Sequence, residues 1–225
     1  MGNRKTLIAF GAVTLVAIVI GWFLLREEES LPIYQPSDIN PALVDPEVAL
    51  RTNHHVAPFS LINQYGDTVT EDWVKGKIYV ADFFFTRCPT ICPVMSKHIS
   101  ELQKEFDGEW DPLFLSHSVT PVADSVPILY RYSEKYAADP ERWNILTGEK
   151  SHIYDLARKS YFATLDEGDG GFQDFIHTEN FVLVDREGRL RGFYDGTSGE
   201  EVKRMVHDIR VLQRSYSGKA GALEK

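Results

Sequence analysis

The chain has 225 residues, of which 43% are hydrophobic, and its 33 acidic against 24 basic side chains give a formal net charge of −9. This size and apolar content suit one domain of ordinary size with additional segments. The acidic balance argues against nucleic acid as a partner, because phosphate binding needs clustered Lys and Arg, and the sequence has no such cluster.

The N-terminal segment predicts a membrane anchor at Leu7–Leu25. This run carries no charge, and at ~1.5 Å rise per residue it can cross a bilayer core of ~30 Å. Arg4 and Lys5 precede the run and Glu27–Glu29 follow it, so we expect a cytoplasmic stub at 1–6 and the remaining chain outside. The prediction is a single-pass protein of the bacterial inner (cytoplasmic) membrane, with its soluble domain facing the periplasm or the cell exterior.

A cleaved signal peptide is the alternative interpretation of this segment. The apolar run exceeds the usual ~7–15 residues of a signal, and no A-x-A-like cleavage site follows it. No Arg- and Ser-rich transit peptide precedes the run, which favours a bacterial envelope protein over a mitochondrial one. We therefore expect the anchor to stay attached.

Residues 26–56 predict an extended tether between the anchor and the domain. The segment has little periodicity and holds Pro32, Pro36, Pro41 and Pro46. The domain is then expected at 57–216, followed by a disordered tail at 217–225.

Within 57–216 the pattern alternates between strands and helices. The predicted strands are Phe59–Asn63, a short strand near Val69, Ile78–Phe85, Leu113–Ser116, Trp143–Leu146 and a hairpin of Phe181–Val184 with Leu190–Tyr194. The predicted helices are Pro93–Phe106, Ser125–Tyr136, Ser151–Tyr161 and Val202–Leu212, and Asp166–Gly171 is a predicted loop. This order indicates an α/β fold, a thioredoxin-like sandwich preceded by the N-terminal transmembrane helix and tether.

The two cysteines of the chain, Cys88 and Cys92, lie where the first central strand leads into the first helix. Pro93 disfavours helical geometry at the residue before it, so we expect Cys92 at the helix N-cap and Cys88 in the preceding loop. A helix N-terminus stabilises thiolate, which is both a nucleophile and a metal ligand. The location therefore predicts a redox or metal site without choosing between them.

The spacing of the pair bears on that choice. Common dithiol oxidoreductases use C-x-x-C, whereas three residues separate Cys88 from Cys92. Two thiolates suit Cu(I), a third ligand would complete a trigonal site that also holds Cu(II), and zinc would normally require four ligands. A pure dithiol redox pair and a structural disulfide remain open.

Histidine could supply a third ligand. His177 stands just before the predicted strand at Phe181, in a loop that passes beside the cysteine loop in a thioredoxin fold. The other six are expected to be solvated, surface or helix-cap residues, with His98 on the first helix pointing away from the cysteine loop: His54, His55, His98, His117, His152 and His207.

The segment Phe85-Thr-Arg-Cys-Pro-Thr-Ile-Cys-Pro-Val-Met95 resembles the signature of the SCO/SenC family of copper chaperones for cytochrome oxidase assembly. Ser118-Val-Thr-Pro121, Trp143 with Leu146-Thr-Gly148, and the segment from His177 to Asp185 resemble the same family. The similarity runs from about Ala57 to Leu212.

The resemblance implies that Cys88, Cys92 and His177 ligate copper, as Cu(I), Cu(II) or both. Asp82 is a weaker candidate for supporting the ligands, and Thr120 stands where the family usually has an acidic residue. The implied function is a metallochaperone, not an enzyme, that delivers copper to the dinuclear copper site of an oxidase subunit. The implied partners are that subunit, a copper donor chaperone and the membrane.

The alternative function is a membrane-anchored thiol-disulfide reductase that keeps the cysteines of the oxidase copper site reduced. Cys88 and Cys92 would then be the redox-active pair, and His177 would be dispensable for turnover.

Overall fold

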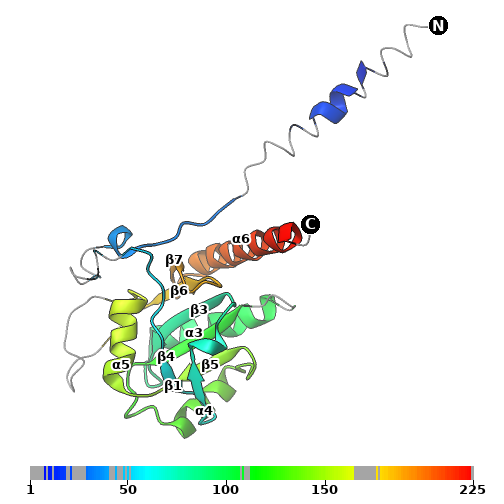
Figure 1. Cartoon of the computed structure of the whole chain (residues 1–225). Helices are drawn as coiled ribbons and strands as arrows, with labels where there is room; N and C mark the ends of the chain where they lie inside the picture. Colours follow the sequence, from blue (N-terminus) through cyan, green and yellow to red (C-terminus); the bar gives the residue numbers. More distant parts are fainter. Residues whose placement is uncertain are drawn as a thin grey trace. The chain divides into compact units, whose positions relative to one another are not determined.

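The computed structural model describes residues 8, 10, 11, 13–18, 21, 29–40, 44, 48, 50, 52–106, 108, 112–164, 176 and 178–223. The chain forms two compact units, Met1–Ser30 and Leu31–Lys225. Figure 1 shows the course of the chain through both.

In the N-terminal unit, the described residues between 8 and 18 are helical and exposed. Among all residues described, no helix is both long and apolar enough to cross a membrane. Several positions of the predicted anchor at Leu7–Leu25 lie outside the described residues.

A five-stranded mixed sheet forms the centre of the second unit, with the strand order β5-β4-β3-β6-β7. Strands β3, β4 and β5 run parallel, whereas β6 is antiparallel to both β3 and β7. Every residue of β3 and β4 is buried, as expected for strands covered on both faces. The strand bounds are β3 Tyr79–Phe84, β4 Leu113–Ser118, β5 Trp143–Leu146, β6 Asn180–Val184 and β7 Leu190–Asp195.

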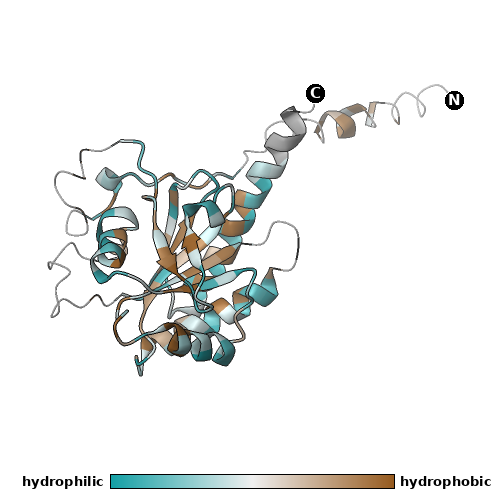
Figure 2. Ribbon diagram, turned by 60° about the horizontal axis from the view of Figure 1, so that its bottom comes forward, coloured by the Kyte–Doolittle hydropathy of each residue, from teal (hydrophilic) through white to brown (hydrophobic). Residues whose placement is uncertain are grey.

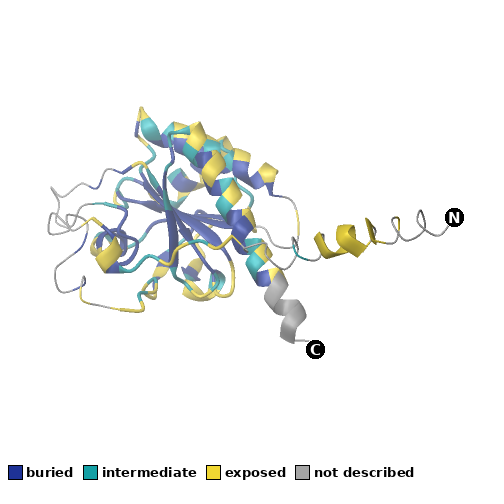
Figure 3. Ribbon diagram, turned by 90° about the horizontal axis from the view of Figure 1, so that it is seen from above, coloured by how far each residue is buried: buried dark blue, intermediate teal, exposed yellow. Residues whose placement is uncertain are grey.

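Two apolar clusters fill the two faces of this sheet. On one face, Val80 and Phe84 of β3 pack with residues of α3 (Ile91–Glu105), α4 (Val126–Lys135) and α6 (Gly199–Leu223). Figure 3 shows the strands of the sheet as buried, whereas the helices carry both buried and exposed residues. Figure 2 shows the same helices with both hydrophobic and hydrophilic residues. These three helices therefore cover one side of the sheet.

The opposite face is covered by smaller elements. There Tyr79 and Phe83 of β3 pack with residues of α5 and of a two-stranded hairpin. The hairpin pairs β1 (Ser60–Ile62) with β2 (Thr68–Thr70), and α5 (Lys150–Asp155) continues into a π-helical turn at Leu156–Ser160. With helices on both faces of a mixed sheet, the structure confirms the predicted thioredoxin-like α/β sandwich.

The compact unit begins at Leu31, whereas the sequence predicted the start of the domain at residue 57. Arg191 of β7 donates to the carbonyls of Leu31 and Pro32 at 2.7 and 2.8 Å, and the Tyr34 N–H donates to Leu190 O at 2.9 Å. The prolines that suggested a tether thus lie in a segment whose described start is bonded to the sheet edge.

The predicted end of the last helix at Leu212 was wrong, since α6 continues to Leu223. Tyr216 is buried in the same apolar cluster as Leu212, and its hydroxyl donates to Glu187. This aromatic residue extends the packed face of the helix beyond the aliphatic pattern. Helix is therefore found in part of 217–225, where a disordered tail was expected.

Candidate metal centre

The cysteine loop joins the end of β3 to the start of α3. The loop begins with a turn in which the Cys88 N–H donates to Phe85 O at 3.2 Å. The helix begins at Ile91 with Thr90 as its N-cap, so the prediction of Cys92 as N-cap was wrong. Pro93 lies in the first turn, where backbone N–H groups have no partner within the helix and none is lost to proline.

Both cysteines are free thiols and both are buried, with exposed fractions of 5% for Cys88 and 2% for Cys92. The backbone N–H of Cys92 donates to the Sγ of Cys88 at 3.5 Å. Thr90 Oγ1 lies 3.8 Å from the same sulfur. The helix start therefore brings the two residues together and directs polar groups at Cys88.

The two thiols differ in acidity. Burial alone would raise the pKa of Cys88, but hydrogen bonds from the backbone of Cys92 and Thr90 outweigh it and lower the pKa to about 7. Burial raises the pKa of Cys92 to about 12, and the neighbouring Cys88 and Asp82 add to the rise. Near neutral pH, Cys88 thus supplies thiolate while Cys92 retains its proton.

Asp82 lies on β3, on the sheet face covered by α3. Its side chain is 2% exposed and accepts a hydrogen bond from Ser116 Oγ at 2.5 Å, and Ser116 Oγ in turn accepts from Trp143 Nε1 at 2.9 Å. Burial raises the pKa of Asp82 to about 7 despite the Ser116 bond. The buried carboxyl is thus held by a chain of neutral hydrogen bonds, with a pKa near neutrality.

A second buried carboxylate, Asp124, was not identified from the sequence. It lies in the loop between β4 and α4 and accepts hydrogen bonds from the backbone and hydroxyl of Thr86, two residues before Cys88. The segment Ser118–Pro121, which carries part of the resemblance, ends three residues before this carboxylate. The only available sequence signal was an acidic residue that closely follows Ser118 and Thr120.

His177 lies outside the described residues, but its neighbours on both sides are described. Ile176 is 3% exposed, and its N–H lies 3.4 Å from the Tyr154 hydroxyl, which itself donates to Val119 O at 3.1 Å. Thr178 Oγ1 donates to Ala163 O at 2.6 Å. The positions before and after His177 are therefore fixed in the core, and one of them is linked to the loop that follows β4.

Two histidine predictions were wrong. His117 was expected at the surface but is fully buried, with its ring stacked on Phe83 at 4.8 Å and its Nε2 atom without a hydrogen-bond partner. His54 was expected to be solvated, yet its Nε2 lies 2.8 Å from Ser160 O and its ring contacts Phe162. Contacts with segments distant in the sequence bury His117 fully and His54 in part, and the residues next to each histidine in the sequence do not reveal these contacts.

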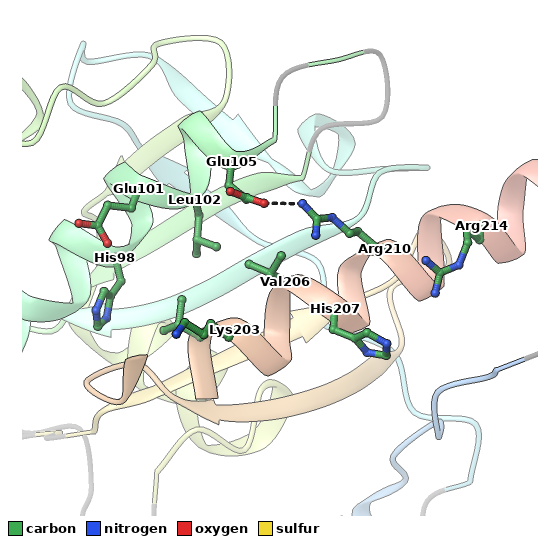
Figure 4. Close-up of a pocket in the computed structure, with 10 residues that line it drawn as sticks. His98, Glu101, Leu102, Glu105, Lys203, Val206, His207, Arg210 and Arg214 are labelled. Carbon is green, nitrogen blue, oxygen red and sulfur yellow. Dashed lines mark hydrogen bonds and ion pairs between the residues drawn. The ribbon is translucent and has the colours of Figure 1, made fainter. Parts of the chain in front are cut away.

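A groove of about 530 Å³ lies between α3 and α6 (Figure 4). His98 of α3 lines it and bonds to Gly196 O at 2.8 Å, while Arg210 of α6 pairs with Glu105 across it. Neither cysteine lines this groove. Within the described part of the chain, no three His, Cys, Asp or Glu side chains come together as a metal site.

Comparisons with known proteins agree on one family. A family model described as SCO1/SenC matches residues 48–213. The SCO1 protein homolog of Bacillus subtilis is 34% identical over 160 residues, which cover 70% of this chain and 82% of that protein.

Solved structures show the same likeness. BsSco, described as a member of the Sco family of cytochrome c oxidase assembly proteins with a disulfide switch, is 34% identical with a TM-score of 0.61 over 71% of this chain and 94% of that chain. Bradyrhizobium japonicum ScoI, solved with copper bound, is 25% identical with a TM-score of 0.56 over 70% of this chain and 99% of that chain.

Proposed function

Because the chain belongs to the SCO1/SenC family, we propose that it is a copper metallochaperone, which holds one copper ion through Cys88, Cys92 and His177. One relative is solved with copper bound, and another is described as a member of a family of cytochrome c oxidase assembly proteins. The observation that carries the proposal is the pair of free thiols joined through one turn of chain at the start of α3.

The donor set fits copper. Two sulfur ligands suit soft Cu(I), and a nitrogen from His177 would make the site trigonal and better able to hold Cu(II). Metal binding requires both cysteines as thiolates, and Cys88 already ionises near neutral pH. Cys92, with its raised pKa, would release its proton only as copper binds.

Copper is the cargo in this proposal, and a dinuclear copper site on a cytochrome c oxidase subunit is its destination. The ion would pass by stepwise exchange, in which an incoming ligand binds before a chain ligand leaves. A copper donor chaperone would load the site. Oxidation of Cys88 and Cys92 to a disulfide would remove both sulfur ligands, so loading requires the reduced pair.

The proposed location is the bacterial inner membrane, with the domain outside the cytoplasm. The support is the uncharged run at Leu7–Leu25 with Arg4 and Lys5 before it. Labelling of intact cells with a membrane-impermeant thiol reagent tests this proposal. Modification of Cys88 without cell lysis supports it, and modification only after lysis contradicts it.

Copper binding to the reduced full-length chain tests the function itself. We expect one equivalent of copper to bind, loss of binding in a Cys88→Ser/Cys92→Ser double variant, and weaker binding in His177→Ala. His207→Ala is the matched control, because His207 is an exposed histidine of α6. Equal copper affinity of His177→Ala and His207→Ala would remove His177 from the ligand set.

A thiol-disulfide reductase that acts on the oxidase copper-site cysteines is the second candidate. The unequal acidity of the two thiols favours it, since a thiolate at Cys88 is a ready nucleophile beside a protonated Cys92. Reduction of a model disulfide at an unchanged rate in His177→Ala, without copper binding by the parent protein, would replace the metallochaperone proposal by this one.

A further inference from the structure

The Asp124 carboxylate is fully buried and is held by four uncharged donors. Its Oδ1 accepts from the Thr86 hydroxyl at 2.5 Å, and its Oδ2 accepts from the Thr86 N–H at 3.2 Å. Oδ2 also accepts from the hydroxyls of Ser118 at 2.6 Å and Thr120 at 2.9 Å. Burying a carboxylate is unfavourable unless such bonds compensate it, so this arrangement needs all its donors in place.

These bonds join two loops that meet at the carboxyl end of the parallel strands. Thr86 belongs to the chain between β3 and Cys88, whereas Ser118 and Thr120 belong to the end of β4 and the loop before α4. The Val119 N–H adds a bond to Phe84 O at 2.9 Å. Asp124 thus links the first residues of the cysteine loop to the end of β4 through hydrogen bonds. Strand β4 is itself paired with β3.

We propose that Asp124 is a positioning residue for the copper site. By accepting hydrogen bonds from Thr86, it holds the cysteine loop in the conformation that presents Cys88 and Cys92 to one metal ion. This inference deepens the proposed function and rests on it for the identity of the metal. Groups that orient metal ligands without touching the metal commonly change metal affinity by about 10- to 100-fold when they are removed.

A purely structural role is the competing explanation, because Asp124 also lies just before α4 and ties its approach to β4. The two explanations differ in what a substitution changes. A structural residue lowers the unfolding temperature and leaves the affinity of the folded protein for copper unchanged. A positioning residue lowers that affinity in protein that is still folded.

The main experiment measures Cu(I) affinity of the reduced full-length protein, by competition with a chromophoric Cu(I) chelator, in Asp124→Asn. An amide removes the negative charge and puts an N–H₂ group in place of one carboxylate oxygen, so the hydrogen bonds to Thr86 weaken or must reverse direction while the side-chain shape is kept. We expect affinity to fall by about tenfold or more.

Asp185→Asn is the matched control. Asp185 is an equally buried carboxylate, bonded by Arg189 and Arg191, and it follows Val184, which pairs with Tyr79 at the opposite end of β3 from the cysteines. This variant should lose stability yet bind copper as the parent does. Asp124→Asn with parental affinity, at any unfolding temperature, would overturn the proposal.

A gentler pair of variants guards against misfolding of Asp124→Asn. Thr86→Val removes the hydroxyl donor, whereas Thr86→Ser keeps it, so only the valine variant should weaken copper binding. Since Thr86 and Asp124 act through the same bonds, the effects of Thr86→Val and Asp124→Asn should combine less than additively. Equal copper affinities of Thr86→Val and Thr86→Ser, both at the parental value, would contradict the proposal.

A copper-independent measurement separates this inference from the proposed function. At pH 9 the Cys88 thiol is ionised, and its rate of alkylation by iodoacetamide then reports how accessible the loop leaves it. We expect several-fold faster alkylation in Asp124→Asn and no change in Asp185→Asn. If the parent binds no copper, the copper proposal fails, but unchanged alkylation in Asp124→Asn would still refute the positioning of the loop by Asp124.

Discussion

Two buried titratable side chains on adjacent strands have opposite effects on how stability depends on pH. Asp82 and His117 are both almost fully buried, and His117 Nδ1 lies 3.1 Å from the backbone O of Asp82. Burial raises the pKa of Asp82 from 3.8 to about 7 and lowers that of His117 from 6.5 to about 4. Both groups are therefore neutral in the folded protein over much of the acidic range.

The signs of the two contributions follow from proton linkage. Between pH 4 and 7 the folded state keeps a proton on Asp82 that the unfolded chain has lost, so this contribution is greatest at low pH and is lost as pH rises. Below pH 6.5 the unfolded chain protonates His117 and the folded state does not, so that contribution is lost as pH falls towards 4. Their slopes oppose each other.

We predict that single substitutions expose each slope in the metal-free protein. Relative to the parent, Asp82→Asn should gain stability as pH rises from 4 to 7, and His117→Phe should gain stability as pH falls from 6.5 to 4. The relative change in unfolding free energy should be on the order of 3 kcal/mol in each case, from 1.36 kcal/mol per pKa unit. Chemical denaturation at a series of pH values measures it. Parallel pH profiles for both variants and the parent would contradict the burial argument.

The thiol acidities predict distinct alkylation profiles at the same scale. In Cys92→Ser, the rate of Cys88 alkylation should rise through a midpoint near pH 7, because the remaining backbone donors still stabilise the thiolate. In Cys88→Ser, alkylation of Cys92 should stay slow up to about pH 10, because its pKa is raised to about 12. A midpoint below pH 9 for Cys92 would show that the helix start does not separate the two thiols.

At the scale of elements, the docking of α6 on the sheet depends on one close approach. Tyr194 of β7 donates to Asp208 of α6 at 2.7 Å, and Arg204 stacks over the Tyr194 ring at 4.2 Å. A Cβ at Gly192 would lie 2.2 Å from the Tyr194 hydroxyl oxygen. Glycine is therefore required there so that the tyrosine can reach the helix.

We predict that Gly192→Ala displaces the Tyr194 ring and loosens α6. The expected loss of stability is about 1–3 kcal/mol, the usual range for overpacking a buried site. Gly199→Ala is the control, because a Cβ there meets no heavy atom within 4 Å. Urea denaturation of both variants provides the measurement. Equal stabilities would mean that the ring moves aside without releasing the helix.

At the scale of the whole molecule, residues between Leu31 and Val56 that precede β1 bond to the sheet edge and pack in the core. Arg191 is 9% exposed and joins Asp185 to the carbonyls of Leu31 and Pro32, and the Val56 N–H donates to Gly188 O at 2.8 Å. Ile39, Val44 and Val48 are buried in the core. The sheet edge and part of the core therefore need residues that precede β1.

Truncation tests this dependence. A chain that begins at residue 31 should keep the unfolding temperature of the domain, whereas a chain that begins at residue 57 should lose it markedly, because Arg191 and the core residues lose their partners. Thermal unfolding followed by circular dichroism measures both. A chain from residue 57 that unfolds at the same temperature would support the prediction that 26–56 is a tether.

The sequence by itself determined the elements and the position of the cysteine pair. The apolar run at β3, the helix after Pro93 and the hairpin from Phe181 follow from periodicity and turn residues, which depend on neighbours close in the chain. These local rules also placed Cys88 and Cys92 between a buried strand and a helix.

Only the tertiary structure decided which residues distant in the sequence contact these elements and the cysteine loop. The bond from Thr86 to Asp124 spans 38 residues and that from Arg191 to Pro32 spans 159. The buried His117 contacts the rings of Phe59, Phe83 and Tyr161, which come from other parts of the chain. No local pattern encodes such pairs, because each depends on how whole elements pack. For the same reason periodicity determined where the thiols lie, whereas packing determined what holds their loop and how acidic each one is.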